Sequence, residues 1–110
     1  MEDIRYKVHA EFCKLFGNSK RLQIMDLLRH GEKQAGELCE KLDINPANLS
    51  QHLSLLKRAG AISDRREGNN IFYSLTHMRI IEAVDIIQEV IKDILTERKG
   101  QVEIPFDNES

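Results

Sequence analysis

The chain has 110 residues, enough for one domain with its own core and too few for two independent domains. Apolar residues make up 41% of it and charged residues 31%, and the formal net charge of −2 indicates no partner by itself. No stretch approaches the roughly 18 consecutive apolar residues that a membrane span requires, and the acidic N-terminus is unlike a signal peptide. Two cysteines far apart make no disulfide framework. We therefore expect a cytoplasmic protein without a membrane partner.

The charges are unevenly distributed along the chain. Residues 1–75 carry twelve basic and ten acidic side chains, whereas residues 76–110 carry four and eight. Within residues 46–66, four basic side chains stand against one acidic side chain. Such a local excess of positive charge is a modest electrostatic footprint of a nucleic-acid binder.

Three helices are predicted in the first part of the chain. Apolar residues recur at helical spacing over residues 3–16, and Gly17 ends the run. A second helix opens at a cap, either Asn18 or Ser19, and a third helix covers residues 34–42.

A fourth helix has the clearest start. Asn45 is a favoured N-cap, and Pro46 stands at the first helical position, where proline is tolerated. Leu49, Leu53 and Leu56 are spaced by four and three, so they are expected to face inward. Short helices joined by tight connections predict helix-turn-helix packing.

The pattern then changes from helix to strand. Residues 62–66 and 71–75 are expected to form two strands around Glu67-Gly68-Asn69-Asn70. Glycine and asparagine are expected to supply the positive φ that a hairpin turn requires. Residues 100–110 are expected to form a flexible C-terminal tail behind a single domain over residues 1–99.

A long final helix is expected from a cap at Thr76 to about Arg98. Its apolar stripe is wider than one contact inside a small domain needs, which favours a two-fold homodimer through the first and last helices. A helix that packs only on its own domain is the alternative. The residues expected at the dimer interface are Ile4, Val8, Ile80, Val84, Ile87, Ile91 and Ile94.

The fourth helix also has a polar face, opposite its leucines. Its first turns carry small and amide side chains, which bond to base edges when a recognition helix enters the major groove. Arginines and asparagines of the hairpin are candidates for backbone or minor-groove contacts, and three other basic residues for phosphate contacts. The candidates are Pro46, Ala47, Asn48, Ser50, Gln51 and Ser54 on the helix, Arg65, Arg66, Asn69 and Asn70 in the hairpin, and Lys20, Lys57 and Arg58 for phosphate. An ordinary solvated surface is the alternative, and His52 is expected to be half-buried.

Three segments lie within residues 15–75: LFGNSKRLQIMDLL, GELCEKLDINPANLSQHLSLLKRAGAI and REGNNIFYSL. Together they resemble the ArsR/SmtB family of winged-helix repressors. The resemblance implies a mostly α (α+β) fold: a winged helix-turn-helix with a two-stranded wing and five helices, dimerised through the first and last helices. It also implies a homodimeric transcriptional repressor that binds double-stranded operator DNA and leaves it when a signal arrives.

Many members of that family sense metals, and their ligands can be sought here. The family's pair of cysteines on the third helix corresponds to Cys39 and Lys41, and a cation repels a metal ion. The family's other site, on the last helix, would fall on His77, Arg79, Val90 and Asp93. Two of those four ligands are lost, so we expect no metal at either place.

The two cysteines allow two interpretations. A lone cysteine in a helix is most often a small core residue. The run GELCEKL also resembles a branch of the family that senses oxidants or reactive sulfur through a third-helix thiol, with Cys13 as the only available second thiol for Cys39. A soft metal held by His9, Cys13 and Cys39 is a weaker hypothesis, and no other cofactor is expected. Thiol oxidation or a thiophilic metal would then release DNA.

No catalytic constellation is evident. The chain has no glycine-rich phosphate loop, no HExxH motif and no nucleophile elbow, so we expect no enzymatic activity. The alternative to a repressor is a winged-helix module that binds a protein partner and not DNA. Substitution of Gln51 or Arg66 would separate the two.

Overall fold

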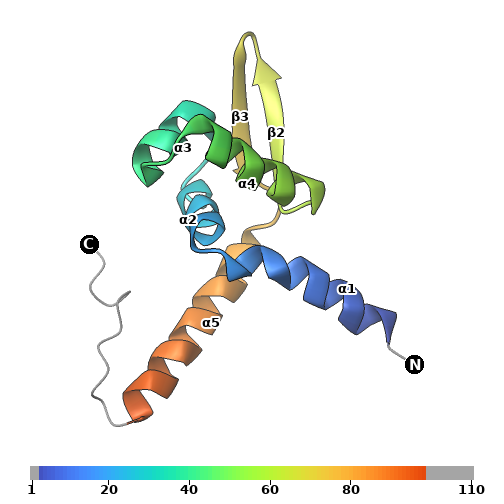
Figure 1. Ribbon diagram of the computed structural model, residues 1–110, viewed down its shortest axis with the longest axis vertical. Helices are drawn as coiled ribbons and strands as arrows, with labels where there is room; N and C mark the ends of the chain where they lie inside the picture. The colour runs from blue at the N-terminus through green and yellow to red at the C-terminus, as the bar shows by residue number, and fades with distance from the viewer. Residues whose placement is uncertain (1–2, 99–110) are drawn as a thin grey trace. The chain divides into compact units, whose positions relative to one another are not determined.

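The computed structural model describes residues 3–98, which divide into two compact units between Met78 and Arg79. Among these residues, the first unit contains four α-helices, a 3₁₀-helix and three strands, and the second contains one long helix (Figure 1). The five α-helices match the number predicted. The expected C-terminal tail, residues 100–110, lies outside the described residues.

The first two helices both begin at a side-chain cap. The Asp3 carboxylate accepts a hydrogen bond from the backbone N–H of Arg5 at the start of α1 (Ile4–Cys13). The chain then tightens into the 3₁₀-helix η1 (Lys14–Gly17), so the single helix predicted over residues 3–16 is in two parts. Of the two caps predicted for α2 (Ser19–Leu28), the structure uses Asn18.

The helix-turn-helix is formed by α3 (Ala35–Leu42) and α4 (Pro46–Arg58), with a tight turn between them. Asp43 takes the left-handed conformation there, with φ of 54°. Aspartate tolerates this conformation better than most side chains do. Lys20 of α2 donates a hydrogen bond to the carbonyl oxygen of Leu42 at 3.1 Å, which satisfies one of the free carbonyl groups at the end of α3.

The start of α4 is as predicted. The Asn45 side chain accepts a hydrogen bond from the backbone N–H of Asn48 at 2.8 Å, and Pro46 is the first helical residue. The leucines on its inner face are buried, and each exposes 5% of its surface or less. The buried apolar residues of the first unit are Leu15, Ile24, Met25, Leu28, Leu38, Leu42, Leu49, Leu53, Leu56, Ala61 and Ile62.

The predicted hairpin is formed by β2 (Ile62–Glu67) and β3 (Asn70–Leu75) around a two-residue turn. Gly68 has a φ of 64°, whereas Asn69 has no positive φ, so the prediction for the turn holds only for the glycine. A third strand, β1 (Lys33–Gln34), pairs antiparallel with β3 and gives the order β1-β3-β2. The expected two-stranded wing therefore belongs to a three-stranded sheet. The sequence did not predict β1, because a strand of two residues is too short to show a hydrophobic period.

Thr76 does not cap the last helix as predicted. Its hydroxyl donates to the carbonyl oxygens of Gly60 and Ala61, at 2.7 and 3.1 Å, and its N–H donates to that of Ala61 at 3.1 Å. Thr76 is thus used to tie the end of β3 to the junction between α4 and β2. The last helix, α5 (Met78–Glu97), begins two residues later.

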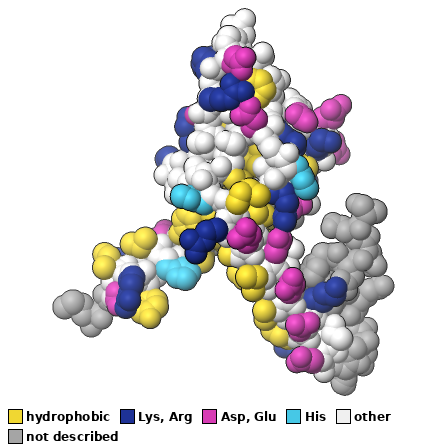
Figure 2. Space-filling model, turned by 180° about the vertical axis from the view of Figure 1, so that it is seen from behind, with side chains coloured by type: hydrophobic (Ala, Val, Ile, Leu, Met, Phe, Trp, Pro, Cys, Tyr) yellow, Lys and Arg dark blue, Asp and Glu magenta, His cyan; other side chains and the backbone are white. Residues whose placement is uncertain are grey.

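The last helix, α5, has 20 residues, all but the first of them in the second unit, and it has an exposed apolar face. A row of hydrophobic side chains runs along it, beside a row of acidic ones (Figure 2). The large apolar side chains that it exposes are Met78, Ile86, Ile87, Val90, Ile91 and Ile94. Across residues 3–98, no helix combines the length and the apolar character that a membrane crossing demands.

Candidate nucleic-acid interface

The outer face of α4 presents the side chains predicted to meet base edges. Pro46, Ala47, Asn48, Ser50, Gln51 and Ser54 are all exposed. Leu49, Leu53 and Leu56 anchor the opposite face in the core, so the exposed residues face outward. The face carries hydroxyl and amide groups without charge, which is a surface suited to hydrogen bonds with bases.

The N-terminus of α4 offers fewer free donors than a helix normally has. Pro46 has no N–H, and the N–H of Asn48 is already bonded to Asn45. Within the described residues, the N–H of Ala47 is left without an acceptor in this turn. Binding of a nucleic acid by α4 would therefore depend more on its side chains than on the backbone N–H groups of its first turn.

A groove of about 250 Å³ lies between α4 and the sheet. Its walls are formed by Ala35, Pro46, Leu49, Ser50, Leu53, Ser54, Lys57, Asp64 and Tyr73. Lys57 of α4 donates to the Asp64 carboxylate of β2 at 2.8 Å, and this bond raises the pKa of the Lys57 ammonium. The ion pair joins the candidate recognition helix to the hairpin.

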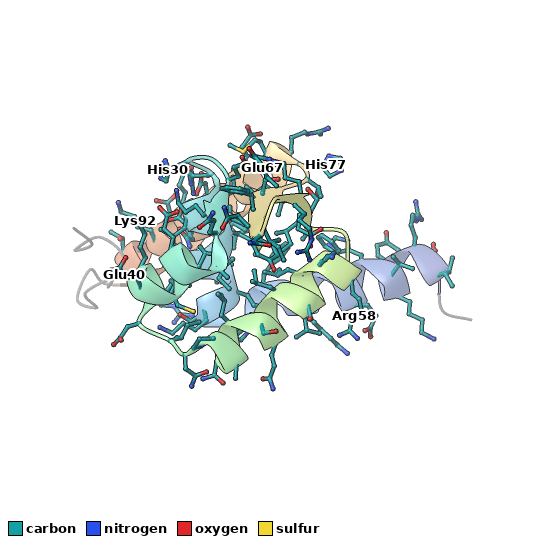
Figure 3. The ribbon with its side chains drawn as sticks, turned by 90° about the horizontal axis from the view of Figure 1, so that it is seen from above. His30, Glu40, Arg58, Glu67, His77 and Lys92 are labelled. Atoms are coloured by element: carbon teal, nitrogen blue, oxygen red, sulfur yellow. The ribbon has the colours of Figure 1, made fainter. Side chains whose placement is uncertain are left out.

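The structure separates the predicted basic contacts into two groups. Lys20, Lys57 and Arg65 are all engaged in hydrogen bonds inside the fold. Arg58 and Arg66 are exposed, and neither has an ion-pair or hydrogen-bond partner among residues 3–98. Arg58 lies at the end of α4 and points outward from it (Figure 3). These two arginines are the cations best placed to meet an external phosphate.

Arg65 lies at the centre of a cluster on the hairpin. Its Nε donates to Oε2 of Glu32 at 3.0 Å and its Nη2 to Oε1 of the same carboxylate, while its Nη1 donates to Oε1 of Glu67 at 2.7 Å. Its guanidinium carbon lies 4.6 Å from the centre of the Phe72 ring. The hydrogen bonds from Arg65 lower the pKa of the Glu32 carboxyl. The pKa of Arg65 is raised, chiefly by its hydrogen bonds to Glu32 and next by its hydrogen bond to Glu67.

The rest of the hairpin tip is open. Arg66, Asn69 and Asn70 are all exposed, and Asn69 belongs to the two-residue turn. Because successive side chains of a strand point to opposite faces, Arg66 points away from the face on which Arg65 meets Glu32.

Arg21 makes a set of contacts that the sequence did not indicate. Its Nε donates to the carbonyl oxygen of Leu15 at 3.0 Å and its Nη2 to that of Lys14 at 3.3 Å. Its Nη1 lies 3.4 Å from Nδ1 of His52 on α4. His52 is half-buried, as predicted, and burial lowers its pKa, with smaller effects from the charges of Arg21 and Lys20. Arg21 therefore links α4 to η1.

The cysteines are both free thiols, with Cys13 exposed and Cys39 half-buried. Over residues 3–98, no three His, Cys, Asp or Glu side chains are grouped so as to hold a metal ion. His9, Cys13 and Cys39 thus form no such group within one chain. A thiol sensor at Cys13 and Cys39 stays a prediction.

The residues predicted at a dimer interface differ in their exposure. Ile4 and Val8 of α1 expose 71% and 61% of their surface, and Ile87, Ile91 and Ile94 of α5 expose between 40% and 54%. Ile80 is half-buried, and Val84 is buried already in the single chain. Four other large apolar residues of α1 and α5 are exposed but were not among those predicted at the interface: Tyr6, Met78, Ile86 and Val90.

The chain is similar to several known proteins. Residues 18–64 match the model of a family described as bacterial regulatory protein, arsR family. The chain is 34% identical over 99 residues to an uncharacterised HTH-type transcriptional regulator of Mycobacterium tuberculosis, covering 89% of this chain and 87% of the relative. It is 35% identical over 85 residues to the arsenical resistance operon repressor of Staphylococcus aureus, covering 77% and 79%.

Two solved structures have the same fold. The crystal structure of a Mycobacterium tuberculosis protein has a TM-score of 0.81 at 34% identity, covering 88% of this chain and 98% of that one. The solution structure of a homodimeric winged helix-turn-helix DNA-binding domain from Mycobacterium bovis has a TM-score of 0.76 at 27% identity, covering 88% and 93%. The match extends well beyond the segment that the family model covers.

Proposed function

Because the chain belongs to the arsR family of bacterial regulatory proteins, we propose that it is a repressor that binds operator DNA as a homodimer. In each protomer, α4 enters the major groove of a half-site. The hairpin β2–β3 follows the neighbouring backbone. Such a protein acts in the compartment that holds the DNA, the cytoplasm.

The observation that carries this proposal is the outer face of α4. Ser50, Gln51 and Asn48 are exposed there, and no acidic side chain interrupts the helix between Pro46 and Arg58. Gln51 and Asn48 are suited to adenine, to which amides bond with two hydrogen bonds. Arg58 and Arg66 are suited to phosphates on either side of that contact.

The homodimer is supported by the exposed apolar face of α5. A face of this kind on a small protein marks an interaction site, and two-fold dimers are the commonest oligomers. The relative from Mycobacterium bovis, described as homodimeric, is consistent with this arrangement.

The proposal is tested by selecting a duplex from random sequences with the purified protein and then measuring the affinity of variants across a range of salt. Gln51→Ala should cost about 1–3 kcal/mol at one base position and relax the preference there. Arg66→Ala should weaken binding evenly across sequences and reduce the salt slope by about one unit. The two substitutions thus separate base reading from phosphate contact.

Arg5→Ala is the matched control for a lost arginine, because Arg5 lies exposed on α1 and its contacts are local: an ion pair with Asp3 and a guanidinium carbon 5.3 Å from the centre of the Tyr6 ring. It should leave affinity and salt slope unchanged. Failure to enrich any duplex, or variants of Gln51 and Arg66 that bind as the wild type does, would favour a winged-helix module that binds a protein partner.

A further inference from the structure

The side chain of Arg65 crosses the sheet from one edge to the other. Arg65 belongs to β2 and pairs in register with Phe72 of β3, whose ring lies under the guanidinium. On the far side of β3, Gln34 of β1 also pairs with Phe72, and the Glu32 carboxylate comes just before that strand. One guanidinium therefore connects β2, the Phe72 ring of β3 and the residue that precedes β1.

This crossing matters because β1 is very short. Its two residues pair only with Tyr73 and Phe72, so the outer residues of β3, Asn70 and Ile71, have no partner in β1. The hairpin projects beyond α3 and α4 (Figure 1). The neighbouring residue Asp64 points to the opposite face of β2, where it pairs with Lys57 of α4. Two ion pairs thus hold the same strand from its two faces.

We propose that Arg65 is a positioning residue, which with Glu32 fixes the hairpin for DNA, and that Arg66 alone supplies the wing's arginine contact to phosphate. The inference rests on the proposed function. Both hydrogen-bonding edges of the Arg65 guanidinium face carboxylates, and its flat face covers Phe72. Arg66, one residue along, is exposed and has no such partners among the described residues.

The two possible roles of Arg65, positioning the hairpin or contacting a phosphate, predict opposite effects of Glu32→Gln on DNA affinity. If Arg65 bound a phosphate, Glu32→Gln would free its guanidinium and remove a negative charge, and DNA affinity would rise. If Arg65 positions the hairpin, Glu32→Gln loosens the hairpin, which must then be ordered on binding. Affinity should then fall by about two- to tenfold.

The experiment compares Glu32→Gln, Arg65→Gln, the double variant and Arg66→Gln on the selected duplex across a salt series. We expect the first two to weaken binding with a salt slope close to that of the wild type, and the double variant to bind no worse than Arg65→Gln, because both changes break one interaction. Arg66→Gln should reduce the slope by about one unit. Glu40→Gln, at an exposed acid on α3, is the control for a lost negative charge.

A measurement without DNA keeps the two proposals apart. Amide hydrogen exchange in β2 and β3 should become faster in Glu32→Gln and Arg65→Gln and stay unchanged in Arg66→Gln, with thermal unfolding confirming that each variant is folded. Exposed ion pairs contribute little to global stability, so all should fold. Tighter DNA binding by Glu32→Gln, a slope lower by about one in Arg65→Gln, or unchanged exchange would overturn the inference. A wild type that binds no duplex, with exchange as expected, would overturn only the proposed function.

Discussion

His52 belongs to the candidate recognition helix, but its imidazole contacts Arg21 of α2. It lies half-buried, with Nδ1 3.4 Å from Nη1 of Arg21, and Arg21 in turn holds two carbonyl groups of η1. The neutral ring can accept from the guanidinium, whereas a protonated ring would face a second cation. The neutral form is therefore the one that fits this site.

The lowered pKa of His52 predicts how stability depends on pH. Because the pKa is lower in the folded state, the unfolded chain takes up the proton first as the pH falls through the ordinary value of about 6.5. The contribution of His52 is complete above that pH and is lost progressively below it. We expect the free energy of unfolding to fall between pH 7.5 and pH 5.5 more steeply in the wild type than in His52→Gln.

Urea unfolding at a series of pH values measures this difference. His77→Gln removes one exposed imidazole and is the matched control. If His52→Gln and the wild type had the same pH dependence, His52 would not be held in its neutral form by the fold.

At the scale of the element, the start of α4 is fixed by local chemistry. The Asn45 side chain bonds to the N–H of Asn48, just as Asn18 bonds to that of Arg21 at the start of α2. Each cap satisfies a donor that the helix cannot. Since α4 carries the outer face proposed to read DNA, its first turn is the part whose order matters most.

Asn45→Ala should lower the free energy of unfolding by about 1 kcal/mol, because the N–H of Asn48 loses its partner. Asn18→Ala should cost a similar amount, since it removes an equivalent bond from α2. Chemical denaturation measures both. Asn69→Ala, in the exposed turn of the hairpin, should change stability by less than about 0.5 kcal/mol. An equal loss in all three variants would mean that the caps contribute nothing specific.

Elements with strong local signals could be predicted from the sequence. The cap at Asn45, the proline beside it and the leucine spacing determine α4 without help from the rest of the chain, and they also place its polar face. Contacts between distant segments could not be predicted. Arg65 and Glu32 are 33 residues apart, and nothing local distinguishes Arg65 from Arg66 until β1 pairs beside β3. The hydrogen bonds of Thr76 could not be predicted either, because the carbonyl groups of Gly60 and Ala61 are 16 and 15 residues away in sequence.

At the scale of the whole molecule, α5 leaves apolar surface in contact with water. Ile87, Ile91 and Ile94 are spaced along one side of it by four and three residues, and each exposes at least 40% of its surface. Such a stripe is the pattern of a helix that packs against a second helix. A second copy of the chain is the partner that the proposed function requires.

Ile91→Glu should convert the dimer to a monomer, because it places a charge within that stripe. Sedimentation equilibrium measures the association. Affinity for a duplex with two half-sites should fall by about a hundredfold or more when the protomers bind separately. Thr96→Glu adds the same charge elsewhere on α5 and should leave the dimer intact. A wild type that sediments as a monomer at micromolar concentration would contradict the proposed dimer.

The length of the hairpin turn has a consequence for which arginine meets which partner. Gly68 and Asn69 alone separate the two strands, with Glu67 opposite Asn70. Inserting one amino acid ahead of Gly68 would slide β2 by a single step and turn over every side chain on it. Arg66 would then come to lie on the side of Glu32, and Arg65 would be turned to the outside. The spacing between Arg65 and the two-residue turn thus determines which of the two neighbouring arginines faces Glu32.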